Sequence, residues 1–205
     1  MTKLTAICVY CGSSNGSDPA MMEAARGLGQ AMAAGGIDLV YGGGNNGLMG
    51  AVARAVLAGG GRVIGIIPEF LRDKERMLDP ARNPDQLEMV VVDDMHTRKR
   101  LMFERADAFV ALPGGIGTLE ELVEQMTWVQ LDRHSKPVVI ADIAGFWEPL
   151  LSLVDHMRQQ GFIRAEADVR YRVAGSVDEV IPTIRAALAR AERAGTVKTD
   201  LDMPV

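Results

Sequence analysis

The chain has 205 residues, of which 48% are hydrophobic and 24% are charged, so it can bury the core of one large domain and does not have the composition of a disordered protein. Its net charge of −5 provides no overall positive field for a nucleic-acid backbone or an anionic membrane surface, and we expect neither as a partner. No apolar run approaches the roughly 20 residues that span a bilayer, and the start of the chain lacks the parts of a secretory signal, so we expect a cytoplasmic protein.

Short apolar runs alternate with amphipathic segments along the chain. The apolar runs predict strands at residues 5–10, 37–41, 62–67, 87–92, 108–112, 137–141 and 170–173. The intervening segments predict helices at residues 19–34, 48–58, 95–106, 118–131, 147–160 and 177–194. This alternation is typical of an α/β protein with a doubly wound parallel sheet and helices on both faces. We therefore predict a single domain over residues 1–194, followed by a flexible C-terminal tail over residues 195–205.

Residues 69–86 interrupt this alternation with many charges and two prolines. We predict a long surface loop for this segment, with a mobile lid as the alternative.

The two cysteines, Cys8 and Cys11, form a C-x-x-C pair in the sequence ICVYC, which is typical of a strand. Residues three apart in a strand point to opposite faces of the sheet, and the second half of a four-cysteine zinc site is missing. We therefore expect two buried thiols rather than a redox or metal site.

Glycine-rich sequences follow the first, second and fifth predicted strands. They read CGSSNGSD from Cys11, YGGGNNGLMG from Tyr41 and PGGIGTLEE from Pro113. Ligands of open parallel sheets bind beyond the carboxyl ends of the strands, and backbone amides at the start of the next helix bind anions. These junctions therefore predict a site for an anionic ligand.

The second junction also has the spacing of a dinucleotide-binding fingerprint. Gly42, Gly44 and Gly47 fit G-x-G-x-x-G between a strand and a helix. The acid that binds ribose in such proteins, roughly 20 residues further on, is missing, since Arg62 and Val63 stand there. This disfavours a dinucleotide enzyme, and the lack of a G-x-x-x-x-G-K-[ST] sequence leaves a P-loop nucleotidase unsupported.

Thr118 and Glu121 in the third junction have two interpretations. T-x-x-E is a capping box, in which the threonine caps a helix and the glutamate binds the amide of the cap. The alternative is a functional carboxylate, which the helix predicted at 95–106 favours. Arg98 and Lys99 flank the apolar stripe of that helix near its start, where the helix dipole opposes positive charge. A bound phosphate beside the glycine-rich junctions would compensate these cations.

Together, LVYGGGNNGLMG, the MHTRK segment and PGGIGTLEE resemble the Lonely Guy (LOG) family, the cytokinin riboside 5′-monophosphate phosphoribohydrolases once misnamed lysine decarboxylases. The family pattern P-G-G-x-G-T-x-x-E is matched at every fixed position from Pro113 to Glu121, and the similarity runs from about Ile7 to Ala187. The resemblance implies a Rossmann-like homodimer that hydrolyses the N-glycosidic bond of a purine nucleoside 5′-monophosphate. The products would be ribose 5-phosphate and a free base, such as adenine or an N6-prenylated adenine.

The resemblance also implies which residues form the site. The family's catalytic arginine and glutamate fall on Arg98 and Glu121, and a further family glutamate falls on Glu75, although the segment after it is longer here than in plant members. Expected substrate contacts are Ser13, Gly43, Gly44, Lys99, Gly114, Gly115, Ile116, Gly117, Thr118, Leu119, Glu120 and Thr127.

Loss of a base from ribose develops positive charge at C1′ and the ring oxygen, so a carboxylate beside the sugar stabilises the transition state. We therefore expect glycine amides to bind the phosphate, Glu121 to face the ribose and Glu120 to bind a ribose hydroxyl. No cofactor is expected, and the scattered His96, His134 and His156 predict no metal site. The alternative function is a non-catalytic carrier of a nucleotide or of molybdenum cofactor, which relatives of this fold bind.

Overall fold

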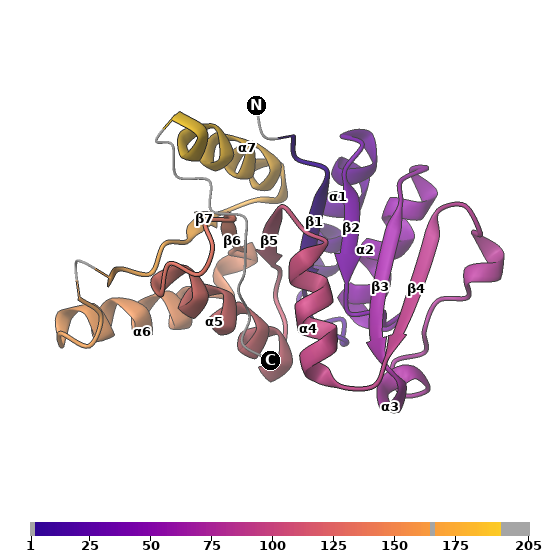
Figure 1. Ribbon diagram of the computed structural model, residues 1–205, viewed down its shortest axis with the longest axis horizontal. Coiled ribbons are helices and arrows are strands. Elements are labelled where there is room, and N and C mark those ends of the chain that lie inside the picture. Colours follow the sequence, from indigo (N-terminus) through magenta and orange to yellow (C-terminus); the bar gives the residue numbers. More distant parts are fainter. Residues whose placement is uncertain (1–2, 165–166, 194–205) are drawn as a thin grey trace.

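In the computed structural model, which describes residues 3–164 and 167–193, seven parallel strands form one sheet in the order β4-β3-β2-β1-β5-β6-β7 (Figure 1). The strands are β1 Ala6–Tyr10, β2 Asp38–Tyr41, β3 Val63–Pro68, β4 Leu87–Val92, β5 Ala108–Ala111, β6 Val138–Ala141 and β7 Arg172–Ala174. Every predicted strand is present, and the predicted doubly wound parallel sheet of a single α/β domain is confirmed.

Helices connect the strands. The α-helices are α1 Pro19–Ala34, α2 Gly47–Ala58, α3 Glu69–Arg72, α4 Met95–Glu104, α5 Ile116–Gln130, α6 Glu148–Gln159 and α7 Val177–Arg193, and the 3-10 helices are η1 Pro80–Arg82 and η2 Ile143–Gly145. Asp18 is the N-cap of α1, since its carboxylate accepts a hydrogen bond from the amide of Ala20, as the preference for aspartate at this position predicts. β7 begins two residues later than predicted, and Arg170, which precedes it, donates from its guanidinium to the carbonyl of Val129 on α5.

The helices cover the two faces of the sheet in separate layers. Buried residues of α1, α2 and α7 share one core, and those of α4, α5 and α6 share the other. Cys11 lies in the first core and Cys8 in the second, and both thiols are free, as predicted. Burial raises the pKa of both thiols well above the usual value, so they stay protonated and unreactive.

Residues 69–86 contain two short helices that the prediction of a surface loop lacked. The carboxylate of Asp79 caps η1 by accepting a hydrogen bond from the amide of Ala81. The segment folds back onto the second glycine-rich junction, where the amide of Asn45 donates to the carbonyl of Glu75 at 2.9 Å. It therefore lies beside the carboxyl ends of the strands, where the ligand is expected.

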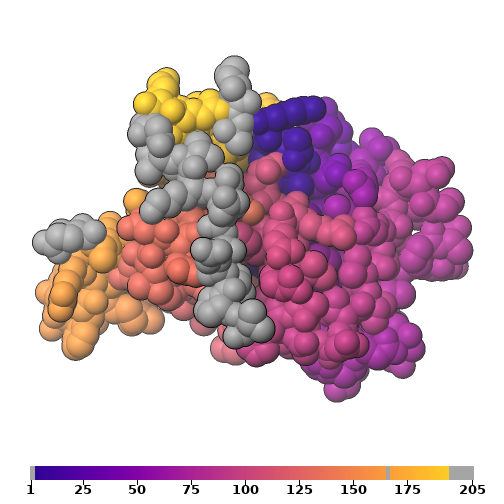
Figure 2. All heavy atoms as spheres, viewed as in Figure 1, coloured from indigo at the N-terminus to yellow at the C-terminus, as the bar shows by residue number. Residues whose placement is uncertain are grey.

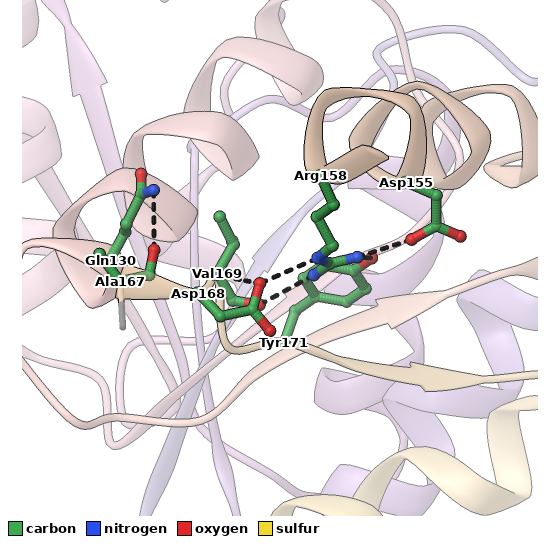
Figure 3. A network of polar contacts seen from close by, with 7 residues as sticks. All are labelled: Gln130, Asp155, Arg158, Ala167, Asp168, Val169 and Tyr171. Atoms are coloured by element: carbon green, nitrogen blue, oxygen red, sulfur yellow. Dashed lines mark hydrogen bonds and ion pairs between the residues drawn. The ribbon is translucent and has the colours of Figure 1, made fainter. Parts of the chain in front are cut away.

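Arg158 of α6 fixes the connection between α6 and β7 (Figure 3). Its Nε donates to the Asp168 carboxylate at 2.9 Å and its Nη1 to the Asp155 carboxylate at 2.7 Å. The guanidinium carbon also lies 5.6 Å from the centre of the Tyr171 ring. These contacts hold the chain that leads into β7 against α6.

The space-filling view shows α7 above the segment that contains α5 and α6 (Figure 2).

Among the described residues, no helix combines the length and the apolar character that a bilayer crossing needs. The predicted tail over residues 195–205 lies outside the described residues.

Candidate active site

The candidate site lies where the direction of the strand order reverses, between β1 and β5. From β1 the chain adds β2, β3 and β4 on one side, and from β5 it adds β6 and β7 on the other. Ligands of doubly wound sheets bind at such a reversal, beyond the carboxyl ends of the strands. The junctions after β1, β2 and β5 are the glycine-rich sequences identified above.

The three junctions pack directly on one another. The amide of Gly12 donates to the carbonyl of Pro113 at 3.1 Å, and the amide of Leu48 donates to the carbonyl of Gly12 at 3.0 Å. A Cβ added at Gly114 would lie 2.8 Å from the amide nitrogen of Gly12 and 2.6 Å from the Cβ of Thr118. Backbone packing at these distances leaves no room for a side chain at Gly114, which explains a glycine there.

Helix α5 begins two residues before the predicted start. Gly115 is the N-cap and no side chain caps the helix, so the predicted capping box of Thr118 and Glu121 is wrong. Thr118 instead lies inside the first turn, buried against Gly114. Glu121 lies in the second turn, so capping does not explain its carboxylate.

The start of α5 presents unpaired amides toward open space. The first helical hydrogen bond runs from the amide of Leu119 to the carbonyl of Gly115, so the amides of Ile116, Gly117 and Thr118 have no helical carbonyl to bind. A Cβ at Gly115 or Gly117 would meet no atom within 4 Å. Free amides at the positive end of a helix dipole, with space in front of them, are suited to bind a phosphate.

Arg98 and Glu121 form a buried ion pair beside these junctions. The Nη2 of Arg98 lies 3.6 Å from the Oε1 of Glu121, and the two residues are only 8% and 9% exposed. The guanidinium also packs against Gly42, where a Cβ would overlap Nη2. The structure thus brings together α4, α5 and the second junction around one guanidinium group.

Burial raises the pKa of Glu121 to about 7, against the opposing positive charge of Arg98. The pKa of a carboxyl group in water is near 4.5, the usual value for glutamate. At neutral pH a substantial fraction of Glu121 is therefore protonated in the free protein. A carboxyl group that titrates near neutral pH in a glycine-rich cleft is a candidate for acid–base or electrostatic catalysis.

Glu75 approaches the same guanidinium from the segment over the second junction. A Cβ at Gly44 would overlap the Oε2 of Glu75. Burial raises the pKa of Glu75, and the positive charge of Arg98 opposes that rise. Sequence reasoning placed Glu75 here only through the family resemblance, because a residue in an irregular segment carries no periodic signal.

Unsatisfied polar atoms gather at this edge of the sheet. Within the described residues, the Tyr41 hydroxyl, the Glu75 Oε2 and the Arg98 Nε are buried and have no hydrogen-bond partner. Buried polar groups in native proteins nearly always have partners, so these atoms are suited to bind a ligand or water. Tyr41 and Gly42 belong to the second glycine-rich junction, but neither was named as a substrate contact.

Lys99 is engaged by carboxylates rather than open to a ligand. Its Nζ lies 2.7 Å from Glu120 and 2.9 Å from Glu124, both on α5. Burial lowers the pKa of Lys99, but the hydrogen bonds and charges of the two glutamates outweigh this effect and leave the pKa raised. The cluster joins α4 to α5 next to the Arg98–Glu121 pair.

The remaining predicted contacts are spread over several surfaces. Ser13 is exposed in the first junction, and Gly43 adopts a positive φ of 83° in the second. Leu119 packs partly into the core of the α5 face. Thr127 is exposed, and its hydroxyl donates to the carbonyl of Val123 one turn back. Thr127 lies six positions after Glu121, about 9 Å along the helix axis, so it lies apart from the Arg98–Glu121 pair within one chain.

Comparison with known proteins identifies close relatives. The family model described as possible lysine decarboxylase matches residues 49–184. A protein of Oryza sativa subsp. japonica, named cytokinin riboside 5′-monophosphate phosphoribohydrolase LOG, is 49% identical over 161 residues, which are 78% of this chain and 64% of the rice protein. The Arabidopsis thaliana protein named cytokinin riboside 5′-monophosphate phosphoribohydrolase LOG1 is 41% identical over 198 residues, or 97% of this chain and 91% of the relative. The chain thus matches slightly less than two thirds of the length of the rice protein.

Solved structures share the fold at lower identity. The molybdenum cofactor binding protein of Rippkaea orientalis superposes with a TM-score of 0.61 over 92% of this chain and 99% of that protein, at 22% sequence identity. Similarity at this level of identity concerns the fold alone.

Proposed function

The chain belongs to the Lonely Guy (LOG) family, and on that premise we propose that it is a phosphoribohydrolase that hydrolyses the N-glycosidic bond of adenosine 5′-monophosphates. Its substrates are AMP and N6-substituted forms such as isopentenyladenosine monophosphate. The products are ribose 5-phosphate and the free base, adenine or a cytokinin. The observation that carries this proposal is the buried Glu121 carboxyl group, paired with Arg98 beside the free amides at the start of α5.

The phosphate end of the nucleotide binds at the third junction. The amides of Ile116, Gly117 and Thr118 supply donors, and Gly114 and Gly115 allow the phosphate to approach the backbone. Ser13 in the first junction and Gly43 and Gly44 in the second form the neighbouring walls of this site. No metal or cofactor takes part in the proposed binding.

Glu121 faces the ribose. As the bond between the base and C1′ breaks, positive charge develops on C1′ and the ring oxygen, and a fixed carboxylate stabilises that charge more than it stabilises the substrate. The same carboxylate orients or deprotonates the water that attacks C1′. Because the carboxylate is the active form, activity depends on the fraction of Glu121 that is ionised.

Arg98 holds Glu121 in position and favours its ionised form. The guanidinium packs against Gly42 and pairs with Glu121, and its positive charge also acts on Glu75, so its own movement is restricted. A fixed guanidinium beside the reacting group contributes through positioning, which is worth several kcal/mol when the reacting geometry is held. Glu120, which pairs with Lys99 at the exposed side of α5, binds a ribose hydroxyl.

We further propose a homodimer in the cytoplasm. The outer face of α5 exposes Ile116, Val123 and Leu131, whose exposed fractions are 81%, 42% and 64%. Neighbouring α6 exposes Leu153 and Met157. Exposed apolar residues of this kind are typical of an interface between subunits. Thr127 lies on the same face of α5. In the proposed dimer, Thr127 of one subunit therefore contacts a ligand bound by the partner subunit.

Product analysis tests the reaction. The purified protein is incubated with AMP and, separately, with isopentenyladenosine monophosphate, and free base and ribose 5-phosphate are measured by chromatography. The proposal expects equimolar base and ribose 5-phosphate from at least one of the two nucleotides. Binding of both nucleotides without release of base would instead support the carrier alternative.

A further inference from the structure

A cavity lies at the end of the sheet opposite the candidate active site. Its volume is about 460 Å³, and its walls come from the C-terminal end of α5, the starts of β6 and β7, and the last turns of α7. The glycine-rich junctions lie at the carboxyl ends of the strands, whereas this cavity lies at the amino ends of β6 and β7. The two sites are therefore separated by the length of the strands.

The charges that line the cavity are mostly positive. Lys136, Arg170, Arg172 and Arg190 contribute cations, and Asp132 contributes the single carboxylate among the described lining residues. Asp132 pairs with Arg170 at 2.6 Å. Within the described part of the chain, neither Arg172 nor Arg190 forms an ion pair with a carboxylate. In a chain with a net charge of −5, four cations against one carboxylate among the described lining residues is a local excess of positive charge.

Hydrogen bonds between separate elements hold the walls in place. The Nη2 of Arg170 donates to the carbonyl of Val129 at the end of α5 at 3.2 Å. The Nε2 of Gln130 donates to the carbonyl of Ala167 at 2.9 Å, and the Arg158 contacts fix the next residues against α6 (Figure 3). The cavity is thus formed before any ligand binds, which reduces the entropy lost on binding.

His134 and Lys136 also line the cavity, and hydrogen bonds hold both residues in place. The Nζ of Lys136 donates to the carbonyl of Phe103 at 2.7 Å and lies 3.9 Å from the centre of the Phe103 ring. His134 is buried at 2% exposure, and its Nδ1 accepts a hydrogen bond from the amide of Lys136. These contacts fix the ammonium group beside the Phe103 ring.

We propose that this cavity is a second ligand site, which binds a small molecule that carries at least two phosphate charges. Guanidinium groups bind phosphate through paired hydrogen bonds, and Arg172 of β7 and Arg190 of α7 line the same cavity. A volume of about 460 Å³ is larger than a single phosphate requires and lies within the range of pockets for metabolites. The apolar lining from Val129, Val138 and Ala187 accommodates the carbon part of such a molecule.

Calorimetric titration with pyrophosphate at constant ionic strength tests the proposal. The wild-type chain is compared with the double variant R172Q/R190Q, and with R26Q/R185Q as a control that removes two exposed arginines outside the cavity. We expect pyrophosphate affinity to fall at least about tenfold in R172Q/R190Q and to stay within about twofold of wild type in the control. All four positions are exposed, and matching unfolding midpoints without ligand verify that both variants are folded.

The outcomes are distinguishable from those for the proposed reaction. Pyrophosphate that binds at the start of α5 contributes equally in all three proteins, so the comparison isolates the cavity. Equal pyrophosphate affinity in all three proteins overturns the proposal. An equal loss of affinity in both double variants also overturns it, because the loss then reflects the total surface charge rather than the cavity. Citrate binding that shows the same affinity and the same dependence on Arg172 and Arg190 overturns the assignment to phosphate. Base release from AMP, measured on the same variants, reports only on the first site.

Discussion

The guanidinium of Arg98 lies 3.6 Å from the carboxyl group of Glu121, and both side chains are almost completely removed from solvent. A buried pair of this kind costs desolvation energy, and replacing it with apolar residues is often neutral or stabilising. Stability alone therefore does not explain the pair. Its position beside free helix amides and unsatisfied polar atoms indicates that function does.

Replacement of Arg98 should change the pH dependence of the reaction. Activity requires the Glu121 carboxylate, so kcat/KM should fall as the pH drops below about 7, the pKa of Glu121. Arg98→Gln removes the charge that opposes the rise in this pKa, so the acidic limb should move to higher pH and kcat/KM at its maximum should fall by about 100-fold or more. The pH profile of base release measures both effects. Arg100→Gln on the exposed side of α4 is the control, and an unmoved limb in Arg98→Gln would show that Arg98 does not act through Glu121.

The pKa of Glu121 also predicts how stability depends on pH. Folding raises this pKa from 4.5 to about 7, so the folded state binds more protons than the unfolded state between these values. The free energy of unfolding should therefore decrease as the pH rises from about 4.5 to about 7, by at most about 3 kcal/mol. Glu121→Gln should make this decrease smaller, measured by urea denaturation across that range, whereas Glu104→Gln should keep the wild-type slope. Identical slopes in Glu121→Gln and wild type would contradict the assigned pKa.

Two glycines at the start of α5 should respond in opposite ways to alanine. Gly114→Ala places a Cβ 2.6 Å from the Cβ of Thr118, so it should reduce the free energy of unfolding by about 1–3 kcal/mol. Gly117→Ala meets no atom within 4 Å and lies inside a helix, so it should stabilise the fold by up to about 1 kcal/mol. The same methyl group occupies the space in front of the free amides, so KM for AMP should rise. Denaturant titration and steady-state kinetics measure these effects, and full stability in Gly114→Ala would be inconsistent with the packing of the junctions.

The proposed dimer surface can be disrupted by a single charge. Val123 on α5 is 42% exposed, and Val91 on β4 is 43% exposed at the opposite edge of the sheet. Val123→Glu should convert the dimer to a monomer in sedimentation experiments because it buries a charge in the interface, whereas Val91→Glu should leave the assembly unchanged. Dimers that persist in Val123→Glu would place the interface elsewhere.

Local sequence patterns predicted most of the fold. The strands and helices followed the period of apolar residues, and Asp18 marked the start of α1 because its cap involves only neighbouring residues. The start of α5 was predicted wrongly, since the rule for side-chain caps points to Thr118 whereas the chain uses Gly115 and packs Thr118 against Gly114. That packing depends on contacts with the first junction, which a local pattern does not contain.

The candidate site was predictable only in part. The sequence placed Arg98 and the glycine-rich junctions at the same edge of the sheet, because carboxyl ends of parallel strands share one edge. The pairing of Lys99 with Glu120 and Glu124 was not foreseen, since it depends on how α4 packs beside α5. The position of Glu75 depends on how the 69–86 segment folds back over Asn45, which only the family resemblance suggested. The roles assigned to these residues stay predictions until they are measured.

Single-turnover base release by Glu121→Gln tests the central claim most directly. The substitution keeps the size of the side chain and removes its negative charge, and Glu104→Gln, in a surface pair with Arg100, is the matched control. With AMP bound to excess protein, we expect Glu121→Gln to bind the nucleotide with nearly wild-type affinity and to release adenine about 1,000-fold more slowly, and Glu104→Gln to match wild type in both. Release of adenine at the wild-type rate by Glu121→Gln would contradict the account, because the carboxylate would then have no part in breaking the glycosidic bond.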